Sequence, residues 1–441
     1  MENSNIAFVI LGASGDLNKR KLMPALSRLF DRKEFDASCV IIGSGRSAYT
    51  DENFRSFFNV AEEFKGLLFY HQGISGLKKL IENKGTFTRV IVFMALPPEV
   101  YVSTAQELYN EGFRKETSII IEKPFGYDFA SAVTLNKELS NYFSEDQIYR
   151  NDHYLAKEAV QNILVFRFAN MLFQSQWNAQ HIESIQISAS ETQGIGSRGP
   201  YFDKAGIIRD MAQNHLMQLL ALMTMEAPVT LLPADINAKK IDVLRSLTVE
   251  RSFRYQYVGY RQEKGVHPQS TTETYAELKF AINNFRWAGM PIYMRCGKAL
   301  DRTGTEISVR FKAPPRVLFN EHGSIPQNTI IFKIQPAEGI IVNMSSKEPG
   351  NEIRMSTTNM TFCYRDSFEG EIPEAYQRIL LDVIHGDHTL FVTAEETELL
   401  WKVIEPIVNS GHLSQYKKGE HPPTALDVKW TDFSHYSHIC S

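Results

Sequence analysis

Residues 150–158 gather side chains of the types that bind anions and transfer protons. His153 and Lys157 are four residues apart, so on a helix they would share one face near its N-terminus. With Tyr154 they could hold a dianionic phosphate ester. Asp152 and His153 are neighbours, and in an extended chain their side chains point in opposite directions, which leaves Asp152 for a second site. The alternative interpretation is a capped amphipathic helix with a solvated charge cluster.

A second candidate is His215, which lies in a helix predicted over residues 210–225. Histidine is the natural general base near neutral pH, although a core histidine with satisfied hydrogen bonds is the commoner case. Asp210 precedes His215 by five residues, about 140° around an α-helix, so it is poorly placed to orient the imidazole. If His215 is a base, its orienting carboxylate should come from elsewhere in the chain.

Two lysines follow candidate strands. Lys123 ends an apolar strand in the sequence EKPFG, and ligands sit at the carboxyl ends of parallel strands. The same sequence is also compatible with a simple turn. Lys298 follows Gly297 and could be a second cation for an anionic substrate.

A glycine turn at Gly12 and Gly15 connects a strand to a helix, where backbone N–H groups and the helix dipole favour a phosphate. The spacing GxxGDL is not GxGxxG, so an ordinary strand–helix turn is the alternative. After the next strand, Arg46 stands where a dinucleotide domain specific for NAD usually has a carboxylate. A guanidinium there can pair with a 2′-phosphate, which favours NADP over NAD; the alternative is a solvated arginine.

Two kinds of element must position these residues. Continuous apolar strands at 6–11, 39–42, 89–95 and 118–122 alternate with helices, which predicts a parallel sheet covered on both faces. After about residue 180, alternating segments such as 329–334 and 339–344 predict antiparallel strands with one buried face. We therefore predict an α/β Rossmann-like N-terminal domain (residues 1–152) and a larger α+β C-terminal domain with a mostly antiparallel sheet (153–441). The segment after about residue 411 is predicted to be irregular.

Composition narrows the class of protein. The 441 residues contain 47 Lys and Arg against 51 Asp and Glu, a net charge of −4, which argues against nucleic-acid and membrane-surface partners. Apolar runs of about 18 residues are missing, so no membrane span is expected. The four cysteines are far apart and indicate neither a disulfide framework nor a zinc site, and the tail sequence HYSHIC is not interpreted as a metal site. A reducing cytoplasm is the default location.

Seven segments, in order along nearly the whole chain, resemble the glucose-6-phosphate dehydrogenase family: GASGDLNKRKLMPAL (12–26), ALPP (95–98), IEKPFG (121–126), RNDHYLAKEAVQNILVFRFAN (150–170), RGPYFDKAGIIRDMAQNHLMQ (198–218), MRCGKAL (294–300) and EAYQRILLDVIHGDHTLFV (374–392). The resemblance implies oxidation of β-D-glucose 6-phosphate at C1 to the 6-phosphogluconolactone, the first step of the oxidative pentose phosphate pathway, with NADP taking the hydride. It also implies a homodimer or homotetramer assembled through the second sheet.

The resemblance also implies residue roles. His215 matches the general base and Asp152 its orienting carboxylate. The phosphate clamp matches His153, Tyr154 and Lys157, and the sugar contacts match Lys123, Glu191, Asp210 and Lys298. The cofactor side matches Gly12, Ser14, Gly15, Asp16, Leu17, Arg46 and Tyr101, with Lys123 serving both ligands.

Several positions depart from the family pattern. The family's RIDHYLGKE has Asn151 and Ala156 here, Thr303 stands where a basic residue is usual, and GDY is replaced by residues 73–75. Two alternatives therefore stay open: a dehydrogenase of another sugar 6-phosphate on the same scaffold, and a catalytically silent nucleotide-binding relative. Retention of Asp152, His153, Lys157 and His215 argues against the second.

Overall fold

The computed structural model describes residues 5–315, 317, 325–369, 371–408 and 412–440. The chain divides into two compact units. The first unit comprises Met1–Ala156, Val229–Asn237 and Pro373–Glu398, and the second comprises Lys157–Pro228, Ala238–Ile372 and Leu399–Ser441. The sequence predicted one boundary, near residue 152, whereas the structure adds two later segments to the first unit.

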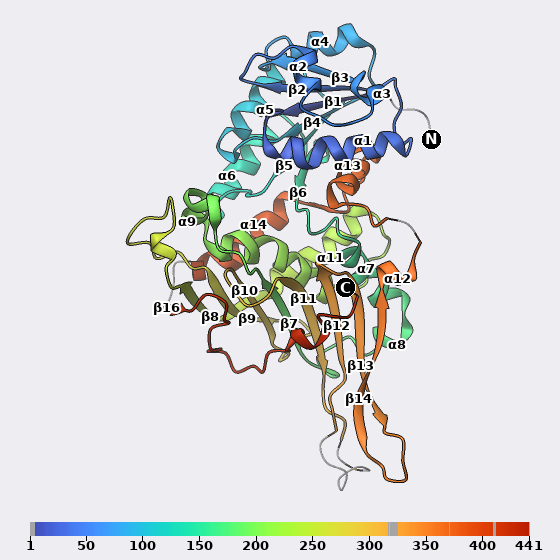
Figure 1. The fold of residues 1–441 in the computed structure, drawn as a ribbon, viewed down its shortest axis with the longest axis vertical. Helices are drawn as coiled ribbons and strands as arrows, with labels where there is room; N and C mark the ends of the chain where they lie inside the picture. Colours follow the sequence, from blue (N-terminus) through green and yellow to red (C-terminus); the bar gives the residue numbers. More distant parts are fainter. Residues whose placement is uncertain (1–4, 316, 318–324, 370, 409–411, 441) are drawn as a thin grey trace. The chain divides into compact units, whose positions relative to one another are not determined.

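The first unit is built on a seven-stranded sheet in the order β15-β6-β5-β4-β1-β2-β3 (Figure 1). Its strands are β1 (Ile6–Leu11), β2 (Val40–Gly45), β3 (Leu68–Gln72), β4 (Arg89–Met94), β5 (Thr117–Glu122), β6 (Ile148–Asn151) and β15 (Phe391–Val392). All neighbours pair in parallel except β15, which is antiparallel to β6. This strand order is that of a dinucleotide-binding Rossmann domain and confirms the predicted fold class.

Helices cover both faces of this sheet, as continuous apolar strands require. The helices are α1 (Met23–Asp31), α2 (Asp51–Arg55), α3 (Glu62–Lys65), α4 (Leu77–Lys84), α5 (Tyr101–Asn110), α6 (Phe129–Ser140) and α13 (Ala375–His385). Every residue of β1 is buried. Phe8 and Ile10 belong to the core formed with α1, α2, α3 and α13, whereas Val9 belongs to the core formed with α4, α5 and α6. Burial on both sides explains why β1 lacks polar alternation.

The second unit contains a nine-stranded sheet in the order β14-β13-β12-β11-β7-β10-β9-β8-β16. Its strands are β7 (Ile182–Ser190), β8 (Leu247–Tyr257), β9 (Tyr275–Ile282), β10 (Ile292–Gly297), β11 (Gly304–Phe311), β12 (Thr329–Gln335), β13 (Gly339–Lys347), β14 (Met355–Cys363) and β16 (Leu413–Tyr416). The pairs β7–β10 and β8–β16 are parallel and the others antiparallel, so the predicted mostly antiparallel sheet is confirmed. In Figure 1, β13 and β14 form a long hairpin.

The central strands β7, β10 and β11 are buried on both faces, contrary to the prediction of one buried face, whereas the edge strand β14 is largely exposed. The polar face of the central strands is covered. The C-terminal segment runs across it: Gln186 accepts a hydrogen bond from the Thr431 N–H (2.8 Å), and Lys333 Nζ donates to the Tyr436 carbonyl (3.0 Å).

The remaining helices are α7 (Glu158–Ala169), α8 (Met171–Gln174), α9 (Gly199–Ile207), α10 (Met217–Thr224), α11 (Pro233–Ser246), α12 (Tyr364–Ser367) and α14 (Ala394–Val408). Helices α11 and α14 contain residues of both units.

The C-terminal region differs from the predictions in two places, although most described residues after 411 are irregular, as predicted. A disulfide joins Cys363 to Cys440, 77 residues apart, although cysteine spacing gave no sign of it. Residues 413–416 form β16 instead of irregular chain, because they pair with the edge of β8.

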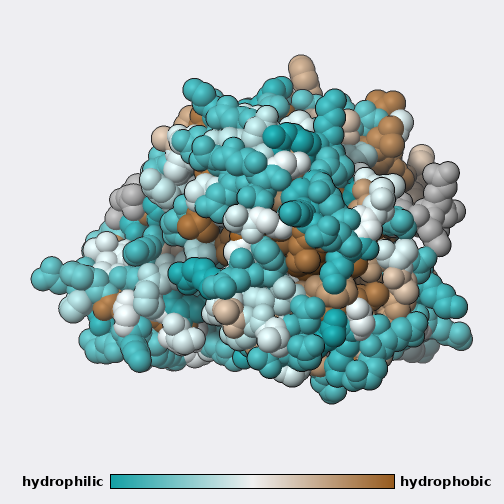
Figure 2. All heavy atoms as spheres, turned by 90° about the horizontal axis from the view of Figure 1, so that it is seen from above, coloured by the Kyte–Doolittle hydropathy of each residue, from teal (hydrophilic) through white to brown (hydrophobic). Residues whose placement is uncertain are grey.

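The outer surface carries mainly polar side chains where Figure 2 displays it. On this face, hydrophilic residues predominate and hydrophobic residues gather in small patches between them. None of the helices in the described part of the chain has the length and apolar character needed to cross a membrane.

Candidate active site

The glycine turn follows β1 in the first unit. Gly12 has φ +82°, and a Cβ atom at this position would lie 2.2 Å from the Ala95 carbonyl oxygen, so only glycine fits. The Gly15 N–H donates to the Gly12 carbonyl (2.9 Å), and a π-helical turn, η1 (Asn18–Leu22), continues into α1. Ser14, Gly15 and Asp16 are exposed and Leu17 is half-buried. The predicted phosphate-binding residues therefore share one tight turn at the carboxyl end of a parallel strand.

The end of β2 lies beside this turn. The Ser44 carbonyl accepts from the N–H groups of Gly12 (2.9 Å) and Ala13 (3.0 Å), which ties the two strand ends together. Arg46 follows β2 and is exposed, and its carbonyl accepts from Gln72 Nε2 (2.9 Å). A guanidinium next to a glycine turn suits recognition of a ribose 2′-phosphate.

Tyr101 and Lys123 meet at the end of β5. Tyr101 is fully buried, and its hydroxyl donates to the Glu122 carbonyl (3.0 Å) and accepts from the Glu122 N–H (3.2 Å). Burial raises the pKa of the Tyr101 hydroxyl above its ordinary range. Lys123 is half-buried at the start of the segment that leaves the strand. Tyr101 thus supports the strand end that carries Lys123, and its predicted contact with the cofactor stays a prediction.

The turn after β6 carries Asp152, His153 and Tyr154. Asp152 is buried, and its Oδ1 accepts from the Tyr154 N–H (3.1 Å). The rings of His153 and Tyr154 are 5.3 Å apart in an edge-to-face arrangement. Helix α7 begins only at Glu158, so His153 and Lys157 do not share a helical face. The prediction that His153 and Lys157 lie on one face of a helix is wrong, because residues 153–156 form a turn.

Lys157 is the residue immediately before α7 in the second unit. The Glu338 carboxylate caps this helix by accepting from the Ala159 N–H (3.0 Å). Burial raises the pKa of the Glu338 carboxyl, and the Ala159 N–H and the Lys157 ammonium counteract that rise. Sequence reasoning missed Glu338, whose only signal was an acidic residue between two predicted strands.

His215 and Asp210 lie in a π-helix, η5 (Ile208–Leu216), and both are buried. The sequence argument assumed an α-helix, in which residues five apart diverge. In a π-helix, hydrogen bonds join residues five apart, which brings such residues close to one face. The predicted separation of Asp210 from His215 around the helix is therefore wrong. Short π-helical segments are frequent at functional sites.

Lys298, Glu191 and Asp210 form a charge cluster in the second unit. Lys298 is fully buried, and its Nζ lies 2.7 Å from Glu191 Oε2 and 3.8 Å from Asp210 Oδ2. The parallel pair β7–β10 explains the first contact: Ser190 pairs with Gly297, so the next residues of both strands emerge side by side. The structure thus unites three predicted sugar contacts.

Thr303 is neutral at a position where the family usually has a basic residue. Thr303 Oγ1 accepts from the Thr192 N–H (3.0 Å), next to Glu191 in the chain. The neighbouring Arg302 pairs with Glu306 and stacks on Phe433, so it does not replace the missing cation.

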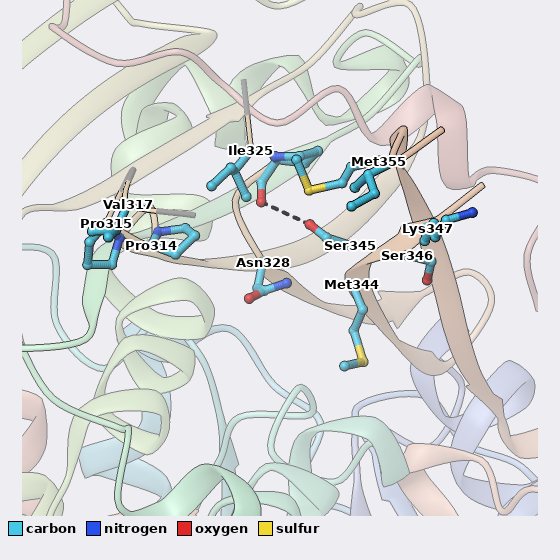
Figure 3. Close-up of a pocket in the computed structure, with 12 residues that line it drawn as sticks. Pro314, Pro315, Val317, Ile325, Asn328, Met344, Ser345, Ser346, Lys347 and Met355 are labelled. Carbon is cyan, nitrogen blue, oxygen red and sulfur yellow. Dashed lines mark hydrogen bonds between the residues drawn. The ribbon is translucent and has the colours of Figure 1, made fainter. Parts of the chain in front are cut away.

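A cavity of about 790 Å³ in the second unit is lined by none of these residues. Figure 3 shows its wall of prolines, methionines and serines near the β13–β14 hairpin, including Pro314, Pro315, Met344, Ser345 and Met355. Lys347 is the one ionisable residue among the described side chains that line it. It offers no acid–base pair for chemistry.

Comparisons with known proteins identify the family of this chain. The family model "Glucose-6-phosphate dehydrogenase, NAD binding domain" matches residues 9–162, and "Glucose-6-phosphate dehydrogenase, C-terminal domain" matches residues 164–436. The chain is 38% identical to glucose-6-phosphate 1-dehydrogenase of Dictyostelium discoideum, over 92% of this chain and 88% of the relative. It is 37% identical to that of Aggregatibacter actinomycetemcomitans, over 97% and 96%.

A solved structure of glucose-6-phosphate dehydrogenase in complex with its substrate glucose-6-phosphate has a TM-score of 0.90 to this chain. Its sequence is 34% identical, and the match covers 96% of both chains. The resemblance drawn from the seven sequence segments is confirmed.

Proposed function

Because the chain belongs to the glucose-6-phosphate dehydrogenase family, we propose that it oxidises β-D-glucose 6-phosphate at C1 to 6-phosphoglucono-1,5-lactone and transfers the hydride to NADP. The observation that carries this proposal is the Lys298–Glu191–Asp210 cluster, because it provides one buried cation and two carboxylates in fixed positions for sugar hydroxyls, in a chain that also has a dinucleotide-type glycine turn.

The chemistry requires a base at C1. His215 accepts the proton of the C1 hydroxyl as the C1 hydride leaves, and Asp152 orients the imidazole and stabilises the imidazolium that forms. The cofactor, when bound, accepts the hydride at its nicotinamide ring. Deprotonation of the hydroxyl makes loss of the hydride easier, since the new carbonyl forms without an intermediate cation.

Binding is divided between two groups of residues. His153, Tyr154 and Lys157 hold the phosphate of the substrate, and Lys123, Glu191, Asp210 and Lys298 hold its hydroxyl groups. On the cofactor side, the turn from Gly12 to Leu17 receives the pyrophosphate, with Tyr101 and Lys123 completing the site. Glycine at position 12 lets this turn pack against the Ala95 carbonyl, and the exposed residues Ser14, Gly15 and Asp16 at the start of the helical segment support a phosphate site there.

Arg46 selects NADP over NAD by pairing with the 2′-phosphate. Its exposure after β2 and the absence of an acidic side chain at that position support this preference.

The protein acts as a cytoplasmic homodimer or homotetramer that assembles through the second sheet. Strand β14 supports this assembly, because it is an edge strand whose residues 357–361 are exposed. Sedimentation equilibrium tests it directly: a monomer at micromolar concentration would contradict it.

A substrate panel with both cofactors tests the proposed activity. Purified protein should reduce NADP faster than NAD with glucose 6-phosphate, and should turn over amino- and deoxy-sugar 6-phosphates more slowly. A preference for another sugar 6-phosphate would instead support the alternative substrate, for which the neutral Thr303 leaves room. Nucleotide binding without turnover of any sugar phosphate would identify a silent relative.

A further inference from the structure

A half-buried carboxyl that the proposed mechanism does not use lies at the end of β5. Glu122 of β5 pairs in register with Asn151 of β6, so their side chains emerge on the same face of the sheet. Asn151 Nδ2 donates to Glu122 Oε1 at 2.6 Å, and the Tyr376 hydroxyl of α13 donates to the same oxygen at 3.2 Å. Two donors from different elements therefore fix one carboxyl oxygen.

Asn151 has little other reason to be polar. Its side chain is 1% exposed, and its Oδ1 has no hydrogen-bond partner among the described residues. An apolar residue would avoid that cost of burial, and the resembling family has isoleucine at this position. The contact with Glu122 accounts for the amide.

Opposing effects act on the pKa of the Glu122 carboxyl. Burial raises the pKa of its carboxyl to about 7, while the hydrogen bonds from Asn151 and Tyr376 and the Lys123 ammonium counteract the rise. Asp152, which follows β6, adds to it. Tyr101 of α5 also faces the carboxyl, and the pKa values of the Tyr101 and Tyr376 hydroxyls are raised, so both stay protonated as donors. Small changes in these contacts thus change the protonation of Glu122 near neutral pH.

Glu122 stands directly beside two groups of the proposed site. Lys123 is the next residue in the chain, and Asp152 follows the residue that holds the Glu122 carboxyl. We propose that Glu122, held by Asn151 and Tyr376, is a positioning residue that fixes Lys123 and Asp152 at the end of the parallel sheet and must be ionised for turnover. This role rests on the proposed function. The ionised carboxylate balances the Lys123 ammonium, and protonation removes that balance.

The pH dependence of kcat/KM with glucose 6-phosphate and NADP tests this role. Asn151→Ile removes one hydrogen bond to the carboxylate, so the acid limb of the profile should move up by about one pH unit. Above about pH 9, where Glu122 is ionised in both proteins, activity should agree with wild type within about two-fold. Tyr376→Phe, which keeps the ring, should move the limb in the same direction.

Glu122→Gln isolates the carboxyl. This variant should show at every pH the low kcat/KM that wild type shows below its acid limb, and adding Asn151→Ile should lower kcat/KM no further, because the group that it acts on is gone. The matched control is Glu398→Leu, which removes a different amide–carboxyl contact of the first unit, Asn136 Nδ2 to Glu398 Oε1 (3.0 Å), and keeps the hydrogen bond from Arg150 Nε to Asn136 Oδ1. It should leave the shape of the profile unchanged.

Two results would overturn the role of Glu122 while leaving the proposed function intact: an active wild type whose acid limb does not move in Asn151→Ile, or a Glu122→Gln variant that keeps the kcat/KM of wild type. Wild-type protein without glucose-6-phosphate dehydrogenase activity would contradict the proposed function itself, and the role of Glu122 with it.

Discussion

Lys298 Nζ lies 2.7 Å from Glu191 Oε2, in a fully buried position where the parallel strands β7 and β10 end together. The second carboxylate, Asp210, is 3.8 Å away. One cation thus lies between two carboxylates at the position where we propose that sugar hydroxyls bind.

Replacing this lysine should affect both folding and binding. Lys298→Met leaves two carboxylates without their buried cation, which should lower the free energy of unfolding by about 3 kcal/mol and raise KM for glucose 6-phosphate. Urea unfolding and steady-state kinetics measure the two effects. Adding Glu191→Gln should restore part of the stability but not the KM; if the double variant is no more stable than Lys298→Met, the charge balance is not the cause.

Arg46 should distinguish the two nicotinamide cofactors. Arg46→Ala removes a charge-assisted pair with the 2′-phosphate, so KM for NADP should rise by about 10- to 100-fold while KM for NAD changes little. Arg32→Ala, which removes another exposed arginine of the first unit, serves as the control. Equal effects of Arg46→Ala on both cofactors would remove its role in selectivity.

The Cys363–Cys440 disulfide should stabilise the second unit. It closes a loop of 77 residues, and the chain-entropy model gives roughly 4 kcal/mol at most for its loss on reduction. Dithiothreitol should therefore lower the urea midpoint of wild type, and Cys440→Ser should unfold at that lower midpoint with or without reductant. A wild-type midpoint that ignores reductant would show that the bond adds no stability.

Glu122 should make folding stability depend on pH. Its pKa is about 7 in the folded protein against an ordinary 4.5, so the folded state keeps a proton that the unfolded state releases between these values. Stability should thus fall as pH rises from 4.5 to 7 and stay constant above, by about 2 to 3 kcal/mol from this group. Urea unfolding of wild type and Glu122→Gln at pH 5 and pH 8 measures it: the variant should lack this part of the loss. Parallel pH dependence of the two proteins would contradict the raised pKa.

The sequence predicted best those elements whose burial is purely apolar. The predicted bounds of β1 match the structure because six consecutive apolar residues are buried on both faces. Strands β6 and β10 were missed because each contains a buried arginine. Arg150 pairs with Glu145, and Arg295 donates to Ser188 and stacks on Trp430. Tertiary partners that no local pattern reveals make these arginines tolerable in a strand.

The candidate site was also only partly predictable from the sequence. The residue types around His153 and His215 could be recognised from the sequence, whereas the geometry there could not. A π-helix has no hydrophobic period that distinguishes it from an α-helix over nine residues, and the Lys298–Glu191 contact joins residues 107 positions apart through a strand pair. Such contacts and geometry can be identified only once the three-dimensional fold is known.

The general base is the central claim of the proposed mechanism, and turnover by His215→Asn tests it most directly. Asparagine keeps polarity but cannot accept the C1 proton, so kcat with glucose 6-phosphate and NADP should fall by about 10²- to 10⁴-fold. The dissociation constant for glucose 6-phosphate, measured by calorimetry, should stay close to that of wild type. A variant that binds substrate and retains full turnover would contradict the assignment of His215 as the base.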